Sequence, residues 1–387
     1  MTIKKRLTEL SRKVLMGSLG ILFRNKKNAV VFCSFHGKQY SDNPRAISER
    51  LHRMRPDYRI IWLLDKKSMN RIHTPGYVHV VPKKTLKEYL ALVSSKVWVY
   101  NNDLPYGTVK SKKQYYIQTW HGDRGFKRVR YDALENMGES YHAIRLCEER
   151  ICDLAVAGSD EGEAKYRSAF HYSGEVLKKG CPRNDRLVRK NPKDAERIRK
   201  KLGLKDEKVV MYAPTFRDNK KGNQKADLDF DALKEKLEKK TGEKWTVLVR
   251  GHSLAGHLLY DKQSGVIDVT DYPDMADLLL VTSFLISDFS STVNDFALLK
   301  RPLVLYLEDY EDYIRNNREL KYDAGSMGYP VVYNMNQLME FVENMDQYSF
   351  DSICSSVLEG YGTVETGRAS EAVSERIIAF VEDVNDR

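Results

Sequence analysis

His121 is the residue best placed to do chemistry in this sequence, and it stands in the run Gln-Thr-Trp-His-Gly at positions 118–122. A β-prone stretch, residues 113–117, precedes the run, and Gly122 allows a turn directly after the histidine. Ligands of open α/β sheets bind outside the carboxyl ends of the strands, so this spacing predicts an imidazole at such an edge. A structural histidine packed under Trp120 fits the same residues.

Three later stretches repeat the pattern of an apolar strand followed by polar residues, at 212–217, 250–253 and 287–291. In the last of them, Ser290 and Ser291 open a predicted helix, whose free backbone N–H groups and dipole favour a phosphate. Plain helix capping explains the two serines as well. The recurrence of polar strand ends favours a ligand site over separate structural explanations.

The other two stretches add cations, a hydroxyl and a second histidine. Arg250 carries a planar guanidinium suited to phosphate oxygens, and His252 can donate or accept a proton near neutral pH. Asp295, in the first turns of the helix after the serines, would accept hydrogen bonds from ligand hydroxyls rather than bind an anion. Thr215 and Arg217, at the end of the first strand of the second half, would bring a hydroxyl and a guanidinium to the same cleft.

Length and composition describe a globular protein of two to three domains. The 387 residues are 42% hydrophobic and 30% charged, with a net charge of +10. This charge fits an anionic substrate, an anionic membrane or nucleic acid, and does not choose among them. Five cysteines without a CxxC pair argue against a disulfide framework or a zinc site. No stretch reaches the roughly 18 apolar residues that a spanning helix needs.

The order of apolar and amphipathic stretches predicts an α/β fold. Strands alternate with helices in a first half, residues 28–190, and again in a second half, residues 191–387, which is typical of βαβ units and parallel sheets. Two such halves predict two doubly wound domains that face a cleft, and the last helix has the option of packing back on the first domain. The predicted strands are 29–33, 59–64, 77–81, 96–100, 114–120, 153–157, 174–178, 208–212, 245–249, 266–269, 284–287, 302–306 and 330–333.

Residues 1–27 form a separate basic segment. Basic residues alternate with apolar ones, and Ile3, Leu7, Leu10 and Val14 fall near one helical face. The pattern favours a basic amphipathic helix on an anionic membrane, where each cation contributes on the order of 1 kcal/mol. An ordinary first helix packed on the domain is the alternative.

Taken together, the motifs resemble those of the CDP-glycerol glycerophosphotransferase family, the primases and polymerases of teichoic acid synthesis. The family has the order Q-T-W-H-G, G-Y-P-R-N-D, A-P-T-[FY]-R, R-x-H, D-[YF]-S-S with an aspartate four residues on, and K-[RK]-P. Here these fall at 118–122, 180–185, 213–217, 250–252, 288–291 with Asp295, and 300–302. The resemblance covers about residues 28 to 345.

Three positions depart from the family pattern. The family often continues His-Gly with Thr-Pro-Leu-Lys, whereas residues 123–127 read Asp-Arg-Gly-Phe-Lys. Cys181 replaces the usual tyrosine, and residues 318–323 replace an R-G-F-Y-F-D segment. These departures concern the identity of the substrate more than the type of reaction.

The resemblance implies a GT-B-like fold of two Rossmann-like domains, with the nucleotide bound mainly by the second. It implies transfer of a polyol phosphate, usually glycerol phosphate, from CDP-glycerol or CDP-ribitol to a hydroxyl of a lipid-linked saccharide or polymer, with release of CMP. The reaction would take place at the cytoplasmic face of the membrane, in teichoic acid or capsule-type polymer synthesis. No metal or other cofactor is expected, because no Asp-x-Asp pair is placed as a metal site.

The family's two important histidines map to His121, which we expect to be the general base for the acceptor hydroxyl, and to His252. With Arg250, His252 would hold the diphosphate. The other expected roles are phosphate binding by Ser290 and Ser291, contacts flanking the nucleotide by Thr215 and Arg217, and a contact from the domain junction by Arg183. The motifs of the resemblance also imply substrate contacts by Gly122, Pro214 and Gly251.

Two other functions account for part of the sequence. A GT-B glycosyltransferase that uses a nucleotide sugar would share the architecture. A basic membrane-binding or nucleic-acid-binding protein without catalysis would explain the charge and residues 1–27, but not the polar strand ends, and no RNP-like or helix-turn-helix signature is present. The choice between glycerol and ribitol, the number of units added and the oligomeric state stay open at this stage.

Overall fold

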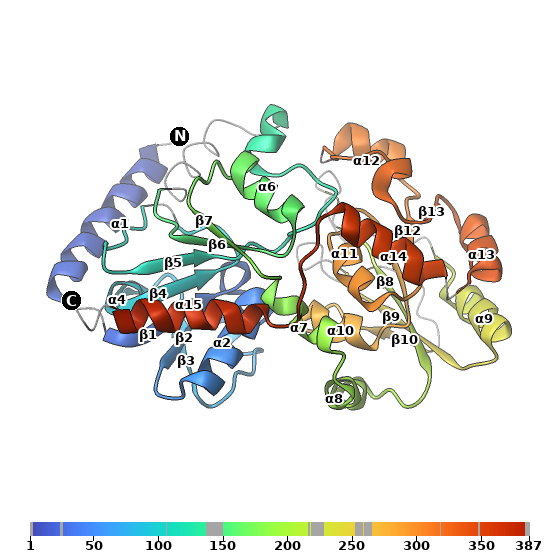
Figure 1. Ribbon diagram of the computed structural model, residues 1–387, viewed down its shortest axis with the longest axis horizontal. Helices are drawn as coiled ribbons and strands as arrows, with labels where there is room; N and C mark the ends of the chain where they lie inside the picture. Colours follow the sequence, from blue (N-terminus) through green and yellow to red (C-terminus); the bar gives the residue numbers. More distant parts are fainter. Residues whose placement is uncertain are drawn as a thin grey trace. The chain divides into compact units, whose positions relative to one another are not determined.

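The computed structural model describes residues 3–23, 26–105, 107–136, 150–215, 217, 228–251, 258, 265–317, 319–346 and 349–383 (Figure 1). By contact the chain divides into two compact units. Unit 1 consists of Met1–Asp123, Val129–Asp185 and Thr363–Arg387, and unit 2 of Arg124–Arg128 and Arg186–Gly362. Three segments therefore fall outside the predicted domain ranges: residues 124–128 and 186–190 group with unit 2, and residues 363–387 group with unit 1.

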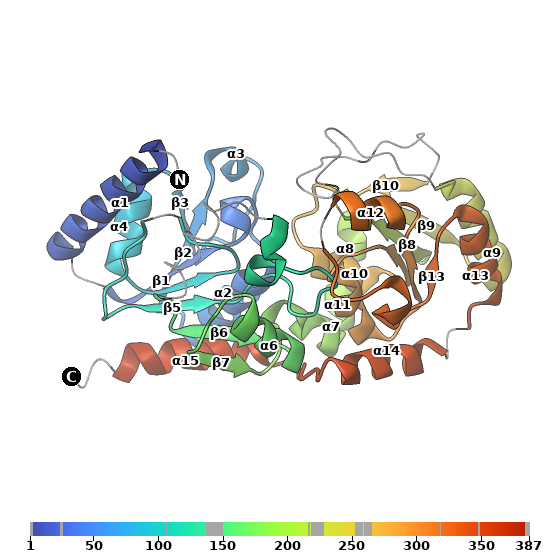
Figure 2. The ribbon, with the colours of Figure 1, turned by 90° about the horizontal axis from the view of Figure 1, so that it is seen from above.

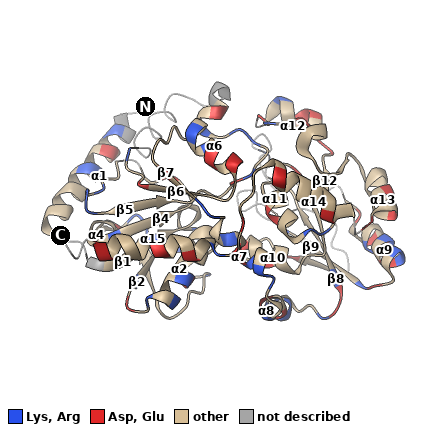
Figure 3. Cartoon of the chain, viewed as in Figure 1, with Lys and Arg blue, Asp and Glu red and all other residues tan. Residues whose placement is uncertain are grey.

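The described part of unit 1 is built on a seven-stranded sheet in which every pairing is parallel, with the order β3-β2-β1-β4-β5-β6-β7. Its strands are near-continuous apolar runs, as a sheet covered on both faces requires. Charged residues lie mainly on the helices and loops around it (Figure 3). The strands are β1 (Lys26–Cys33), β2 (Arg59–Leu64), β3 (Val78–Pro82), β4 (Ser95–Tyr100), β5 (Tyr115–Gln118), β6 (Leu154–Ala157) and β7 (Glu175–Lys178).

Helices cover both faces of this sheet, and the alternation of side chains along β1 shows how. Val30 and Phe32 point into one core with residues of α2 and α15, whereas Val31 and Cys33 point into a second core with residues of α1 and α4. Figure 2 shows α1 beside α4. The helices of unit 1 are α1 (Ile3–Leu22), α2 (Asp42–Met54), α3 (Lys66–Met69), α4 (Leu86–Ser94), α6 (Asp160–Ser168) and α15 (Ala369–Asp383), with 3-10 turns η1 (Phe35–Gly37), η2 (Arg130–Asn136) and η3 (Pro182–Asn184).

The described part of unit 2 repeats this architecture with a six-stranded parallel sheet of order β10-β9-β8-β11-β12-β13. Its strands are β8 (Lys208–Ala213), β9 (Trp245–Val249), β10 (Val266–Asp268), β11 (Phe284–Ser287), β12 (Leu303–Tyr306) and β13 (Val331–Val332). Side chains of β8 again alternate between two cores, so this sheet is also covered on both faces. The predicted α/β fold with two Rossmann-like, doubly wound units is confirmed.

The helices of unit 2 separate into two layers. Ile198 of α8 and the apolar side of α10 pack with Val209 and Met211, while Leu233 of α9 and Leu338 of α13 pack in the other core. The elements are α7 (Asp185–Arg189), which begins at the unit boundary, α8 (Pro192–Leu202), α9 (Phe230–Thr241), α10 (Met275–Val281), α11 (Thr292–Phe296), η4 (Ala297–Leu299), α12 (Tyr310–Asn316), η5 (Ala324–Met327), α13 (Met335–Asn344) and α14 (Ser349–Gly360).

The segment Arg124–Arg128 contributes to the core of unit 2. Phe126 is fully buried there, and its carbonyl accepts a hydrogen bond of 2.7 Å from the backbone N–H of Lys321. The backbone N–H of Arg128 donates to the carbonyl of Glu319 at 2.9 Å. A stretch of a few residues from the first half of the sequence is thus an integral part of the second unit.

Helix α15 completes unit 1. The carboxylate of Asp185 accepts from the backbone N–H groups of Ala369 (2.8 Å) and Ser370 (2.9 Å), which satisfies donors at the start of the helix. From there α15 packs along α2 (Figure 1), and Val373 and Ile377 enter the core around Val30 and Phe32. In the part of the chain that the structure describes, no helix has the length and apolar character needed to cross a bilayer.

Candidate active site

Both sheets have a topological switch point, and the predicted site residues lie at the edges where these occur. In unit 1 the strand order reverses between β1 and β4, and the loops that follow them leave the same edge of the sheet. In unit 2 it reverses between β8 and β11. In doubly wound folds this is the edge where ligands bind.

His121 follows β5 at the carboxyl edge of the unit 1 sheet, and a backbone carbonyl fixes its tautomer. Its Nδ1 lies 2.6 Å from the carbonyl oxygen of Asn101, at the end of β4. A carbonyl oxygen can only accept, so Nδ1 carries the proton and Nε2 presents a lone pair. The ring is half-buried and packs near Trp120 (centroids 4.2 Å apart) and Phe35 (5.4 Å).

The electrostatic surroundings keep His121 neutral near pH 7. Burial lowers the pKa of His121 below its ordinary value, and the bond to Asn101 and the negative charge of Asp42 oppose this shift. The positive charges of Arg183 and Lys165 lower the pKa further. A neutral imidazole with a free Nε2 has the protonation state that a general base needs.

The turn after His121 is held by buried polar contacts. Lys165 on α6 donates from Nζ to the carbonyls of Gly122, at 2.8 Å, and Asp123. The carboxylate of Asp123 accepts from the N–H of Gly158 (2.9 Å) and the hydroxyl of Ser159 (2.6 Å). The carbonyl of Gly122 therefore helps to hold the turn, and the carboxylate of Asp123 fixes the turn to the residues after β6.

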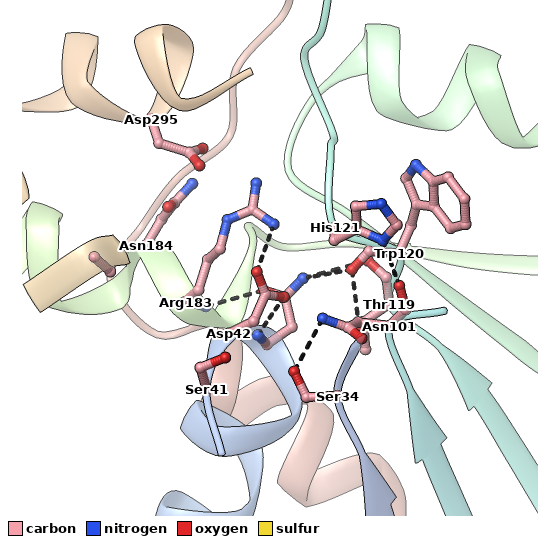
Figure 4. A network of polar contacts seen from close by, with 12 residues as sticks. Ser34, Ser41, Asp42, Asn101, Thr119, Trp120, His121, Arg183, Asn184 and Asp295 are labelled. Carbon is pink, nitrogen blue, oxygen red and sulfur yellow. Dashed lines mark hydrogen bonds and ion pairs between the residues drawn. The ribbon is translucent and has the colours of Figure 1, made fainter. Parts of the chain in front are cut away.

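A second group of contacts ties the end of β5 to α2 and η3 (Figure 4). Trp120 has a φ of +48°, a conformation that an L-residue seldom adopts. Asn43 donates from Nδ2 to the carbonyl of Trp120 at 3.0 Å. Its Oδ1 accepts the backbone N–H of Arg183, also at 3.0 Å. Arg183 also pairs with Asp42 at 3.3 Å. The structure therefore places the predicted contact Arg183 in unit 1, within the polar network around His121.

The switch point of unit 2 is organised by Asp288, which directly follows β11. Its carboxylate accepts the backbone N–H of Thr215 at 2.9 Å, the Thr215 hydroxyl at 3.0 Å and a guanidinium N–H of Arg217 at 2.9 Å. Arg217 also donates to both oxygens of Asp309, each at 2.8 Å. Pro214 and Thr215 are buried at this edge.

The guanidinium of Arg217 is engaged with protein partners at this edge. Its side chain is only 3% exposed, and Nε and both terminal nitrogens already donate to Asp288, Asp309 and Thr215. These bonds fix Arg217 beside Thr215, and its contact flanking the nucleotide stays a prediction. Its carboxylate partner Asp309 lies far away in the sequence, so no local pattern indicates the pairing.

Ser290 and Ser291 lie half-buried at the start of α11, as predicted from the sequence. The Ser290 hydroxyl accepts the backbone N–H of Thr292 at 3.2 Å, while the Ser291 side chain makes no capping bond. The helix predicted to begin at these serines is the short α-helix α11, followed by the 3-10 turn η4. The serines are therefore adjacent to the unit 2 switch point, with Ser290 partly engaged in capping.

Asp295 has a structural partner. It is 7% exposed and pairs with the fully buried Arg124 at 3.3 Å. Asn294 on the same helix donates to the carbonyl of Arg124 at 3.0 Å. This ion pair secures the segment 124–128, and the contact expected between Asp295 and ligand hydroxyls stays a prediction.

Arg250 and Gly251 follow β9. Arg250 is half-buried and donates to the carbonyl of Tyr272 at 2.9 Å, and the N–H of Gly251 donates to the Thr270 hydroxyl at 2.8 Å. Burial lowers the pKa of Arg250 to about 10, so the group keeps its charge at neutral pH. His252 lies outside the described residues. Among the residues that are described, no group of three or more His, Cys, Asp or Glu side chains is placed to hold a metal ion.

Several residues of the site were missed. Asp42 and Asn43 begin α2, and their residue types are as typical of a helix start as of a ligand site. Lys165 lies within a helix that was not predicted, and nothing in its surroundings marks it. Asp288 was recognised as part of a motif but was given no role.

Comparisons with known proteins agree with this geometry. The family described as CDP-Glycerol:Poly(glycerophosphate) glycerophosphotransferase matches residues 16–379. The chain is 32% identical over 377 residues to a teichoic acid poly(glycerol phosphate) polymerase of Bacillus spizizenii, covering 93% of this chain and 94% of that protein. It is 32% identical over 367 residues to a teichoic acid glycerol-phosphate transferase of Staphylococcus aureus, covering 91% and 93%.

A solved structure of the wall teichoic acid polymerase TagF has a TM-score of 0.85 to this chain at 28% identity, covering 98% of both chains. The predicted family and the predicted class of enzyme are thereby confirmed. The match extends over both units, including the strand ends that carry His121, Thr215 and Ser290. The chain belongs to the CDP-glycerol:poly(glycerophosphate) glycerophosphotransferase family.

Proposed function

We propose that this chain transfers glycerol phosphate from CDP-glycerol to a hydroxyl of a lipid-linked saccharide or polymer, with release of CMP. The observation that carries the proposal is the fixed tautomer of His121, because it leaves Nε2 unprotonated at the edge of a sheet. The relatives described above are named for glycerol phosphate and teichoic acid, which supports CDP-glycerol over CDP-ribitol and a teichoic acid product.

In this reaction the acceptor oxygen attacks the phosphorus that bears glycerol, and the bond from that phosphorus to the CMP oxygen breaks. The proton of the attacking hydroxyl passes to Nε2 of His121. Phosphoryl transfer depends chiefly on positioning and on stabilising charge. We assign the latter to Arg250 and His252, with Ser290, Ser291 and the Thr215 loop as phosphate and nucleotide contacts. None of these steps requires a metal.

The purified chain should release CMP when given CDP-glycerol and a lipid-linked disaccharide analogue, and should do so more slowly with CDP-ribitol. Chelation with EDTA should leave the rate unchanged, because the proposed charge stabilisation uses protein cations. A rate that is lost in EDTA and restored by Mg²⁺ would reveal a metal requirement. Release of UDP from a nucleotide sugar, without release of CMP, would instead identify a glycosyltransferase.

The helix α1 supports association with the membrane that carries such an acceptor. A stripe of apolar side chains along this helix is exposed to solvent. It consists of Leu7 (61% exposed), Leu10 (59%), Val14 (61%) and Ile21 (85%). On its other side Met16 is buried against unit 1. Exposed apolar side chains at this spacing, on a helix that also carries basic residues (Figure 3), fit an interfacial helix on an anionic membrane. We place this surface at the cytoplasmic face.

The double variant Leu10→Glu/Val14→Glu tests this helix. It should weaken binding to phosphatidylglycerol vesicles by more than about tenfold, since each buried Leu or Val contributes about 1.5–3 kcal/mol. Turnover of a soluble acceptor should be retained. Ile314→Glu, at an exposed apolar residue of α12, is the matched control. Vesicle binding that is unchanged in the double variant would remove α1 from the membrane contact.

A further inference from the structure

The loop after β1 has a strained backbone at the same sheet edge as His121. Three consecutive residues have positive φ angles: Phe35 at +45°, His36 at +58° and Gly37 at +87°. Glycine adopts this region readily, but phenylalanine and histidine seldom do. Such outliers persist where surrounding contacts impose them, and they gather at functional sites.

Two asparagines after β4 impose this conformation. Asn101 accepts the backbone N–H of Phe35 with Oδ1 at 2.9 Å, and Asn102 accepts that of His36 with Oδ1 at 2.9 Å. The Nδ2 atom of the same Asn102 side chain lies 3.0 Å from Nδ1 of the His36 ring. One amide side chain therefore holds both the backbone and the ring of His36.

These contacts determine the tautomer of His36. A backbone N–H must donate, so the Asn102 oxygen is fixed on that side and its NH₂ donates to Nδ1 of the ring. The proton of the neutral ring is consequently on Nε2. Desolvation, with the positive charge of Lys83, lowers the pKa of His36 to about 4, so the ring is neutral at pH 7.

His36 and His121 are thus neutral imidazoles of opposite tautomer at one edge of unit 1. His121 presents a lone pair at Nε2, whereas His36 presents an N–H at Nε2. Phe35, the residue next to His36, lies 5.4 Å from the His121 ring, between centroids. His36 is one of the exposed residues at this edge.

We propose that His36 determines acceptor specificity by donating a hydrogen bond to the hydroxyl next to the attacking one, at a vicinal diol end of the acceptor. The inference rests on the proposed function. A vicinal diol needs one group that takes the proton of the attacking hydroxyl and another that orients its neighbour, and the two tautomers supply these. A neutral donor suits a hydroxyl oxygen, whereas a phosphate would favour a cation.

The test compares two acceptor analogues, one ending in glycerol phosphate and one ending in 3-hydroxypropyl phosphate, which lacks the neighbouring hydroxyl. The wild-type chain should prefer the diol in kcat/KM by about three- to tenfold, the range expected for one neutral hydrogen bond. In His36→Gly this preference should fall to about one, through loss of turnover of the diol. Glycine is chosen because it accepts a φ of +58° without strain.

The KM for CDP-glycerol should be similar in both proteins, since the proposed donor contacts lie on unit 2. His73→Gly, at an exposed loop histidine of unit 1, is the control and should keep the diol preference. A preference that survives His36→Gly, or one absent from the wild type, would overturn the role of His36 while the proposed function stands. Absence of CMP release with any acceptor would count against both.

Discussion

Replacing His121 by alanine should lower kcat for CMP release by about 10²–10⁴-fold, the usual contribution of a general base. The KM for CDP-glycerol should change little, because the proposed donor contacts lie on unit 2. His79→Ala, at an exposed histidine of β3, should behave as the wild type. Initial rates with saturating acceptor measure the effect. A variant that keeps its rate within threefold would show that another group takes the proton.

The pH profile tests the same residue without deleting it. Because burial lowers the pKa of His121, the base stays neutral as pH falls through the ordinary histidine value of about 6.5, and kcat/KM should decline only below it. The charge of Asp42 raises this pKa, so Asp42→Asn should move the acid limb to still lower pH. A limb that moves to higher pH would contradict this arrangement.

Asp288→Ala should lower the free energy of unfolding by about 3–5 kcal/mol, the range for breaking a buried ion pair. The Asp288 and Arg217 side chains are 2% and 3% exposed. The substitution would leave the Arg217 guanidinium without one of its two carboxylate partners and the backbone N–H of Thr215 without its acceptor. Urea denaturation followed by tryptophan fluorescence gives the measurement.

The control for this prediction is an exposed ion pair. Glu311 and Arg315 on α12 are 70% and 73% exposed, and Glu311→Ala should cost less than about 1 kcal/mol. If Asp288→Ala were no more destabilising than this control, the network around Thr215 would not be the buried scaffold described here.

The strands were predictable because each is a short apolar run bounded by polar residues, and every predicted strand is present. The order of the strands in the sheet was not predictable in detail. For example, β1 pairs with β4, more than sixty residues later, and no local sequence pattern indicates this pairing. The helix α14 was missed, although Phe350, Ile353 and Cys354 have helical spacing and pack in or against the cores of unit 2. Its serines obscured the pattern.

The same distinction applies to the candidate site: residues marked by a local motif could be predicted, and contacts between residues far apart in the sequence could not. The strand-end motifs located His121, Ser290 and Thr215 because the carboxyl ends of parallel strands meet at one edge of a sheet. The partners of Arg217 and Asp295 could not be found in this way, since Asp309 and Arg124 are 92 and 171 residues away in the sequence. Arg217 and Asp295 each have an ion-pair partner on a remote element, which the motifs do not indicate.

Because α15 returns the chain to unit 1, the core of that unit is completed only late in synthesis of the protein. Val373, Ile377 and Val381 of α15 belong to the core that also contains Val30 and Phe32 of β1. Domains usually fold in the order in which the ribosome delivers them. Here the unit that emerges first cannot close its core until residue 383 has been synthesised, so a nascent chain exposes that apolar surface throughout translation of unit 2.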